Sequence, residues 1–441
     1  MPSHSGPSTG PSRRTRSRRG GVDVYLFPAV VGGGLGDIEE VLAAGRRLRR
    51  AGYRIVLYRR PGHPFPRSTE GPWDWPTLER TTRVSPQSPA ALTVAPAWGV
   101  SVAPEGPGRL GRGGVWAEEA SDVERAYGPD RTVHVSLEEF ARTLDSRAET
   151  RERLREGGVP SRQLRARVSA ARDVGEVEAF RRAFVRFRAF DRPNVLHLFA
   201  TFRPNRRFAE EFPNAVQTGP LWARRHAPRS KTRPRLRSRE WVWYASPASA
   251  ERLAPSVLQG LHGSRPPVRL VVRSPRSWPH VSPSDRWTLV SEPVAPRAWR
   301  RRFTLAELRI VTGSRTLLEA LEVGGPFLYF NGVLGSGRRA RRHRPEKIAA
   351  LLDFGRSAGV PRALLRDLAD FARGRRVAAV VRRLAGGARG WDRFRPRPGR
   401  SDFERPFRDA GELLLAVARA LARGRDDAPT IVRRVRGGSN P

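Results

Sequence analysis

The sequence predicts an α/β protein of two doubly wound domains, each built on a parallel sheet, that face each other across a cleft. Three observations predict this class. The 441-residue chain is too long for one ordinary core, because single domains hold about 100 to 200 residues. Apolar, β-rich runs alternate with amphipathic helical stretches in both halves. A basic, Pro-containing stretch almost free of apolar side chains, residues 224 to 240, separates the halves.

These features divide the chain into segments. The predicted segments are a disordered basic tail (1–20), a Rossmann-like N-terminal domain (21–225), a linker (226–240), a Rossmann-like C-terminal domain (241–400) and a C-terminal helical tail (401–441). The N-terminal tail is rich in Ser, Pro, Gly and Arg and lacks the apolar segment of a signal peptide, so we expect a cytoplasmic location. No run approaches the ~20 apolar residues of a spanning helix, so any membrane contact is expected to be peripheral.

The first domain begins with a β-loop-α-β unit. The run "VDVYLFPAVV" (22–31) predicts a buried strand that leads into glycines. In "DIEEVLAAGRRLRRAG" (37–52) the apolar residues recur at helical spacing, with acids at the start and arginines at the end to complement the helix dipole. "YRIVLYRR" (53–60) predicts the second strand.

The remaining strands of this domain are predicted from apolar runs separated by loops. They are "ALTVAPAWGVSVAP" (91–104), "NVLHLFATF" (194–202) and "NAVQTGPLW" (214–222), and a charge-laced helical region is expected over roughly 136 to 190. His197, inside one of these runs, is expected to be a core or surface residue with no catalytic or metal-binding role.

The second domain shows the more regular alternation. Strands are predicted at "EWVWYAS" (240–246), "PVRLVVRS" (267–274), "RWTLVSEP" (286–293), "LRIVTG" (308–313) and "PFLYF" (326–330), with a helix at "AERLAPSVLQGL" (250–261). The region from 360 to the end is expected to be helical and very basic.

Composition narrows the range of partners. Lys+Arg 83 against Asp+Glu 43 leaves a net charge of +40, which indicates anionic partners such as phosphorylated ligands, nucleic acid or acidic lipid. The absence of cysteine excludes disulfides, thiolate zinc sites and cysteine nucleophiles. No H-E-x-x-H or D-x-D sequence is present, and we expect no metal site.

A glycine loop follows the first strand. Gly32, Gly33, Gly34 and Gly36 lie between a predicted strand and a helix, where backbone amides can approach an anion. Their spacing misses the dinucleotide fingerprint G-x-G-x-x-G, and the second strand ends in arginines where an NAD site has an acid. A tight β-to-α turn with close packing is the alternative reading.

The segment "LRIVTGSRTLLEALEVGGPFLYFNG" (308–332) combines a strand, a small polar turn, a helix and another strand. Free amides, hydroxyls and a guanidinium converge at Gly313, Ser314, Arg315 and Thr316, which suits a phosphate, and Ser314 is suited to cap the helix. Glu319 follows one turn later, placed to accept hydrogen bonds from a diol such as ribose. The alternative is a simple i,i+4 ion pair between Arg315 and Glu319.

The stretch "GSRTLLEALEVGGPFLYF" resembles the donor-nucleotide helix of GT-B-fold glycosyltransferases, nearest to the bacterial enzymes that transfer N-acetylglucosamine from a UDP-sugar to a lipid-linked peptidoglycan precursor. The resemblance implies an acceptor-side N-terminal domain, a nucleotide-sugar-binding C-terminal domain and a ribose-binding role for Glu319. "GGGLGDIEEVLAAG" occupies the place of that family's Gly-rich loop. The resemblance spans about 22 to 400, whereas its sharp motifs cover some thirty residues.

The chain departs from the family at several places. Asp37 replaces the loop histidine, and "ASPASA" lacks the glycines expected near the diphosphate, which weakens Ser246 and Ser249 as ligands. "RRARRHRPEKI" stands where the family has glutamines and an asparagine against the donor sugar, so the resemblance does not identify the sugar.

Glycosyl transfer of this kind stabilises a leaving diphosphate and deprotonates an acceptor hydroxyl. The helix terminus at Ser314, Arg315 and Thr316 can supply the first function without a metal or other cofactor. Asp37 is the candidate general base and His63 the second candidate, while a helix-capping role is the alternative for Asp37. The expected partner is a nucleoside-diphosphate sugar, used as substrate.

The acceptor side is less determined. The segment 373–391 alternates arginine clusters with apolar residues and ends in Trp391, a composition that suits an anionic membrane surface and a lipid-linked acceptor. A basic helix packed on its own domain is the alternative. Two other functions stay open: a nucleotide-sugar 2-epimerase or hydrolase on the same fold, and a non-enzymatic nucleic-acid binder. No specific nucleic-acid partner is expected, because the arginines are dispersed and no RNA-binding motif occurs.

Overall fold

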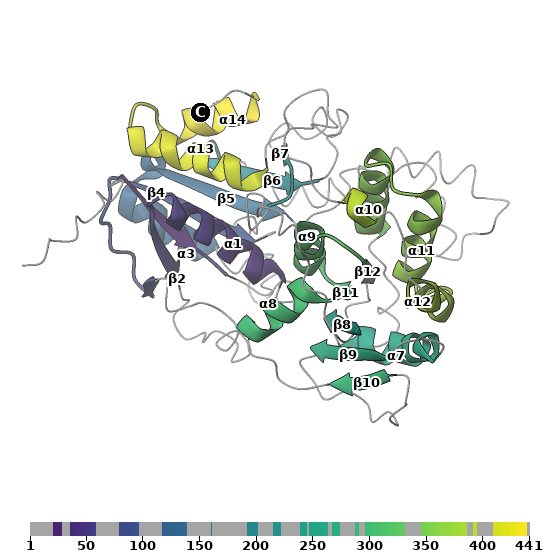
Figure 1. Ribbon diagram of the computed structural model, residues 1–441. Coiled ribbons are helices and arrows are strands. Elements are labelled where there is room, and N and C mark those ends of the chain that lie inside the picture. Colours follow the sequence, from purple (N-terminus) through teal and green to yellow (C-terminus); the bar gives the residue numbers. More distant parts are fainter. Residues whose placement is uncertain are drawn as a thin grey trace, which may run out of the picture.

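The computed structural model describes two parallel-sheet units and the helices that cover them (Figure 1). The residues that it describes are 21–28, 36–58, 79–96, 117–138, 160, 192–201, 215–221, 239–244, 247–262, 267–273, 287–290, 296–330, 345–385, 391–394 and 409–438. The predicted basic tail, 1–20, lies outside them.

The first sheet has seven parallel strands in the order β3-β2-β1-β4-β5-β6-β7. They are β1 (Val22–Leu26), β2 (Arg54–Tyr58), β3 (Glu79–Thr81), β4 (Ala90–Pro96), β5 (Thr132–Glu138), β6 (Val195–Ala200) and β7 (Ala215–Thr218). The sequence analysis missed β5, because "RTVHVSLEEF" opens the charged region assigned there to helix.

Helices cover both faces of this sheet. They are α1 (Gly36–Arg50), α3 (Ala117–Tyr127), α13 (Ala410–Arg423) and α14 (Ala428–Arg436), with a 3-10 turn η2 (Pro129–Arg131). Along β1, Val22, Val24 and Leu26 join the core under α1, α13 and α14, whereas Tyr25 and Phe27 pack toward α3. The strand therefore has an apolar residue at nearly every position, as expected for a sheet buried on both faces.

The C-terminal helices α13 and α14 return to the first sheet, where they lie over β4, β5 and β6 (Figure 1). Asp409 caps α13 by accepting a hydrogen bond from the Glu412 amide at 2.8 Å, and it pairs through its backbone with Gly219. Arg47 of α1 holds the same carboxylate with bonds of 2.7 and 3.2 Å. This forked contact joins the chain's return to α1.

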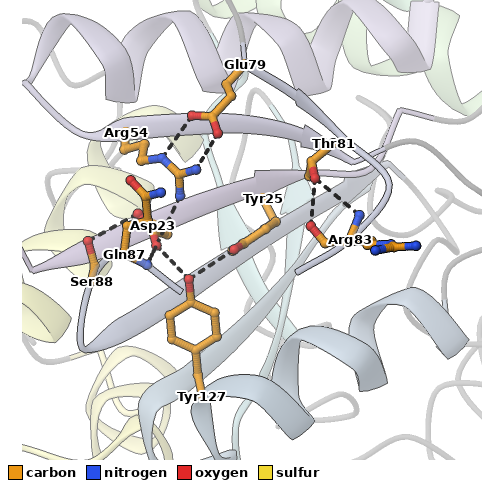
Figure 2. A network of polar contacts seen from close by, with 9 residues as sticks. All are labelled: Asp23, Tyr25, Arg54, Glu79, Thr81, Arg83, Gln87, Ser88 and Tyr127. Carbon is orange, nitrogen blue, oxygen red and sulfur yellow. Dashed lines mark hydrogen bonds and ion pairs between the residues drawn. The ribbon is translucent and has the colours of Figure 1, made fainter. Parts of the chain in front are cut away.

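A polar network ties the amino ends of these strands together (Figure 2). Asp23 of β1 is fully buried and accepts hydrogen bonds from the Tyr127 hydroxyl at 2.6 Å, the Gln87 amide at 2.9 Å and the Ser88 hydroxyl at 3.1 Å. Arg54 of β2 lies 3.3 Å from the same carboxylate. These donors compensate the burial of the charge.

Figure 2 also shows how this network extends outward. Arg54 donates to Glu79 of β3 through Nε at 2.9 Å and through a second, shorter contact. Tyr25 and Tyr127 share a hydroxyl contact at 3.0 Å, and burial raises the pKa of both phenols. The network stabilises the edge opposite the carboxyl ends of the strands, where ligands bind in sheets of this kind.

The second sheet has five parallel strands in the order β10-β9-β8-β11-β12. They are β8 (Arg239–Tyr244), β9 (Val268–Arg273), β10 (Trp287–Val290), β11 (Leu308–Thr312) and β12 (Phe327–Phe330). The predicted linker, 226–240, ends too late, because β8 already includes Arg239 and Glu240.

The helices around this sheet follow the predicted alternation. They are α7 (Pro247–Leu261), α8 (Pro296–Leu305), α9 (Ser314–Val323), α10 (Pro345–Ser357), α11 (Arg362–Ala372) and α12 (Val377–Ala385), with a 3-10 turn η5 (Trp391–Phe394). Every residue of β12 is buried, so both faces of the strand are covered. The predicted fold class, two doubly wound parallel sheets with helices, is confirmed.

The basic segment 373–391 packs on its own domain. Its helix α12 buries Val377, Val380, Val381 and Leu384 against α7, and Trp391 is only 3% exposed. The rings of Trp391 and Phe327 of β12 contact each other in a tilted arrangement, with their centroids 5.1 Å apart. Of the two alternatives for this segment, a basic helix packed on its own domain describes its apolar residues, which lie in the core, and contact of its arginines with a membrane stays a prediction. Its exposed residues include Arg382 and Arg383.

Candidate functional site

Each sheet has one switch point, where the connections that follow two adjacent parallel strands run toward opposite sides of the sheet. In the first sheet this point lies between β1 and β4, and β1 leads through the glycine loop into α1. In the second sheet it lies between β8 and β11, which lead into α7 and α9. The Thr312 hydroxyl at the end of β11 donates to the Tyr244 carbonyl at the end of β8, at 3.1 Å. Open α/β sheets bind ligands at such points.

The turn between β11 and α9 leaves helix amides without internal partners. Gly313 is the N-cap, with φ of 88°, a backbone angle that favours glycine. The expectation that Ser314 caps the helix is wrong, because Ser314 is the first helical residue and Gly313 offers no side chain. Gly313 is exposed, and the first helical bond runs from the Leu317 amide to its carbonyl. The preceding amides of the first turn can therefore meet an anion.

Thr316 contributes differently from the expectation. Its hydroxyl donates back to the carbonyls of Thr312 and Gly313, the latter at 3.2 Å. A hydroxyl has one hydrogen, which is here committed to the backbone. The part of Thr316 that can serve an anion as a donor is thus its backbone amide.

The Arg315 side chain points to the first sheet. It is 4% exposed, and its Nη1 donates to the carbonyl of Leu221, just beyond β7, at 2.8 Å. Its Nε lies 3.6 Å from Glu319, so the i,i+4 ion pair considered from sequence is formed. The Glu319 side chain keeps 37% of its surface exposed, which leaves its carboxylate accessible to a ligand.

α1 and α9 contact each other at this junction (Figure 1), and Glu39 and Glu40, near the start of α1, act electrostatically on Arg315 in the first turn of α9. Burial lowers the pKa of Arg315, but the charges of Glu319 and Glu322 on α9 and of Glu39 and Glu40 on α1 raise it, and the net pKa shift is upward. Arg315 therefore stays charged at the contact between the two helices. Glu39 also accepts a hydrogen bond from Arg46 at 2.8 Å.

Several predicted site residues lie outside the described part of the chain. These are Gly32, Gly33, Gly34, His63 and Ser246. Gly36 and Asp37 are the first two residues of α1, so Asp37 lies inside the helix instead of preceding it. The side chain of Asp37 and that of Ser249, in the first turn of α7, are not among those described. The roles expected for these residues stay predictions.

A buried polar array under α3 has the residue types of a hydrolytic triad. The Thr93 hydroxyl meets His134 Nδ1 at 2.8 Å, and His134 Nε2 meets Glu124 at 2.9 Å. Burial opposes ionisation of Glu124, but hydrogen bonds from His134 and Asn194 hold its pKa at about 2. Thr93 has no exposed surface, so it offers no accessible nucleophile. The array joins α3 to β4 and β5.

Sequence reasoning missed Arg309, which sits inside β11 with no exposed surface. It donates to the carbonyls of Phe303 at 2.6 Å, Thr304 at 2.9 Å and Gly324 at 3.1 Å. These carbonyls lie at the carboxyl ends of α8 and α9, where the helix dipole favours a cation. An isolated arginine in an apolar strand indicates that the buried side chain has hydrogen-bond acceptors, but the sequence does not show which residues supply them.

The described residues contain no cluster of three or more His, Cys, Asp or Glu side chains arranged to hold a metal ion. None of the helices described is both long and apolar enough to cross a bilayer.

Comparisons with known proteins find similarity only among solved structures, since neither a family model nor a curated protein matches. MurG of Acinetobacter baumannii is 12% identical over 83% of this chain and 98% of its own, with a TM-score of 0.36. The glycosyltransferase SnogD of Streptomyces nogalater is 16% identical over 83% and 96%, with a TM-score of 0.38.

A plant structure covers more of this chain. UGT2 of Phytolacca americana, complexed with UDP-2fluoro-glucose and pterostilbene, is 13% identical over 94% of this chain and 99% of its own, with a TM-score of 0.45. All three likenesses are remote. The two-sheet architecture is established by the strands and helices of this chain itself.

Proposed function

We propose that the protein is a glycosyltransferase that moves a sugar from a nucleoside-diphosphate donor to a hydroxyl acceptor. The observation that carries the proposal is the exposed amino end of α9 at the switch point of the second sheet, in contact with α1, which follows the switch-point strand of the first sheet. An exposed helix amino end creates a region of positive potential suited to a diphosphate. The net charge of +40 favours the same class of ligand.

In this proposal the residues of the α9 turn divide the work. The amides that follow Gly313 hold the diphosphate and stabilise the charge that develops on it as the sugar leaves. Glu319, accessible and one turn along, accepts hydrogen bonds from the ribose hydroxyls. Asp37 at the start of α1 or His63 removes the proton of the acceptor hydroxyl.

The test is nucleotide-dependent stability. UDP-, GDP-, ADP- and TDP-sugars are screened by thermal shift, and one nucleotide class should stabilise the protein by about 2.7 kcal/mol at 100 times Kd. Glu319→Ala should lose most of that response, because the ribose hydroxyls lose their acceptor. Glu322→Ala, on the same helix and also half-buried, is the matched control and should keep it. An equal response of all three proteins would contradict the role of Glu319.

We also propose a lipid-linked acceptor, reached from an anionic membrane surface. Because the apolar residues of α12 are buried, the contact would be electrostatic, through exposed arginines such as Arg382 and Arg383. The protein should co-sediment with liposomes that contain anionic lipid at low salt, and it should dissociate at high salt. Neutral liposomes are the control. Failure to co-sediment with anionic liposomes would remove the membrane from the proposal.

A further inference from the structure

The contact of Arg315 with Leu221 crosses from one sheet unit to the other. Arg315 belongs to α9, which packs on β11 of the second sheet, whereas Leu221 follows β7 of the first. Both residues are buried, and the Nη1 to carbonyl distance is 2.8 Å. The guanidinium therefore holds the amino end of α9 against the point where the chain leaves the first sheet.

The two ends of the connection between the sheets are held differently. The outgoing chain at Leu221 is bound by Arg315 of the second unit, and the returning chain at Asp409 is bound by Arg47 of α1. Gly219 and Asp409 pair beside each other, so the two ends are neighbours. Of these two arginines, Arg315 is the one whose contact depends on how the units are placed.

The environment of Arg315 is an unusual one for a phosphate ligand. Its Nε and Nη2 have no hydrogen-bond partner within the described part of the chain, and both atoms are shielded from solvent. The positive charge of Arg315 is balanced by the Glu319 carboxylate, 3.6 Å from Nε, and by the charges of Glu39 and Glu40 on α1. A buried cation with so few hydrogen bonds contributes little net stability, because desolvation offsets its attractions. Its value is in fixing a geometry.

We propose that Arg315 is a positioning residue that sets the placement of the α9 amino end relative to the first sheet, and that it is not a ligand of the diphosphate. The inference rests on the proposed function only for the identity of the ligand. The contact itself needs no ligand. Loss of the guanidinium should loosen the two units relative to each other while the α9 amides and Glu319 still bind nucleotide.

The chain has no cysteine, so a pair of introduced cysteines can be spin-labelled without background. Arg50→Cys on α1 and Arg366→Cys on α11 place labels on exposed positions of the two units. Electron-electron resonance should give a narrow distance distribution with native Arg315, a wider one with Arg315→Met and a restored one with Arg315→Lys. The pair Arg50→Cys and Arg423→Cys, both on the first unit, should not change.

A variant of a second arginine distinguishes a general loss of stability from a loosening of the two units. Arg54→Met removes partners of Asp23 and Glu79 within the first sheet, so it should lower the melting temperature without widening the distance between the units. If Arg315→Met does not fold, Arg315→Gln replaces it, since the shorter, neutral side chain cannot donate to the Leu221 carbonyl from the same backbone position. An unchanged distribution between the units in the neutral variant overturns the proposal.

Nucleotide affinity gives the independent readout. Calorimetry with the nucleotide class found by thermal shift should show a Kd within about threefold of native in Arg315→Met, because the helix amides remain. If Arg315 were instead a ligand of the phosphate, its replacement by methionine would raise the Kd about tenfold or more and leave the distance distribution unchanged. That result overturns the positioning role. If the native protein binds no nucleotide, the proposed function fails, while the spin-label distances still decide the role of Arg315.

Discussion

Arg309→Met should lower the free energy of unfolding by about 3 to 5 kcal/mol, because it removes a buried cation that several backbone carbonyls bind. The guanidinium is fully buried and binds the carbonyls of Phe303, Thr304 and Gly324. Methionine has a similar length but no donor. The substitution would leave these carbonyls without their partner at the carboxyl ends of α8 and α9.

The measurement is denaturant unfolding, with the slope compared to establish that the transition remains two-state. Arg309→Lys is the matched variant, because the ammonium keeps the charge but cannot reach all of the carbonyls in their forked arrangement. It should recover part of the loss. Since α9 carries the candidate nucleotide site, the methionine variant should also weaken the thermal response to nucleotide. A loss below about 1 kcal/mol would show that the carbonyls find other partners.

The second large effect is acid sensitivity through His197. This residue lies in β6 with 1% of its surface exposed, and burial followed by the charge of Arg436 lowers its pKa from the ordinary 6.5 to about 3. Above pH 6.5 both folded and unfolded chains hold the imidazole neutral, so it has no pH-dependent effect. Below that pH the imidazole is protonated in the unfolded chain but stays neutral in the folded chain, so the free energy of unfolding falls with decreasing pH until about pH 3.

The expected loss from His197 alone is about 2 kcal/mol at pH 5 relative to pH 8. Glu124, with its pKa lowered from 4.5 to about 2, adds a loss in the same direction, but only at more acid pH. Unfolding measured at both pH values should show that His197→Leu removes this difference of about 2 kcal/mol. His262→Gln, at an exposed position, is the control and should behave as native. The same acid loss in His197→Leu would refute the assignment.

The sequence alone was sufficient for the parallel-sheet units and for the segment that carries the candidate site. The strand-turn-helix-strand order of 308–332 is local: apolar runs, glycines at both helix ends and helical spacing all point to one structure. For His197 the sequence left a core or a surface position open, and the structure places it in the core, because β6 is buried on both faces of a parallel sheet. β5 was missed because its polar residues, such as His134 and Glu138, mask its apolar alternation.

The tertiary structure decided which partners the charged side chains meet. The sequence predicts that Arg315 contacts a phosphate, and the structure shows in addition that its Nη1 donates to the carbonyl of Leu221, 94 residues away in the chain. For the basic segment 373–391 the sequence left two alternatives, a membrane surface and a helix packed on its own domain, and the structure places the apolar residues of α12 against α7 and Trp391 against Phe327 of β12. Local patterns record that a face is apolar or that a cation is present. The core that covers an apolar face, or the acceptor that binds a cation, comes from distant parts of the chain. These partners are therefore decided only when the two sheets and their helices pack together.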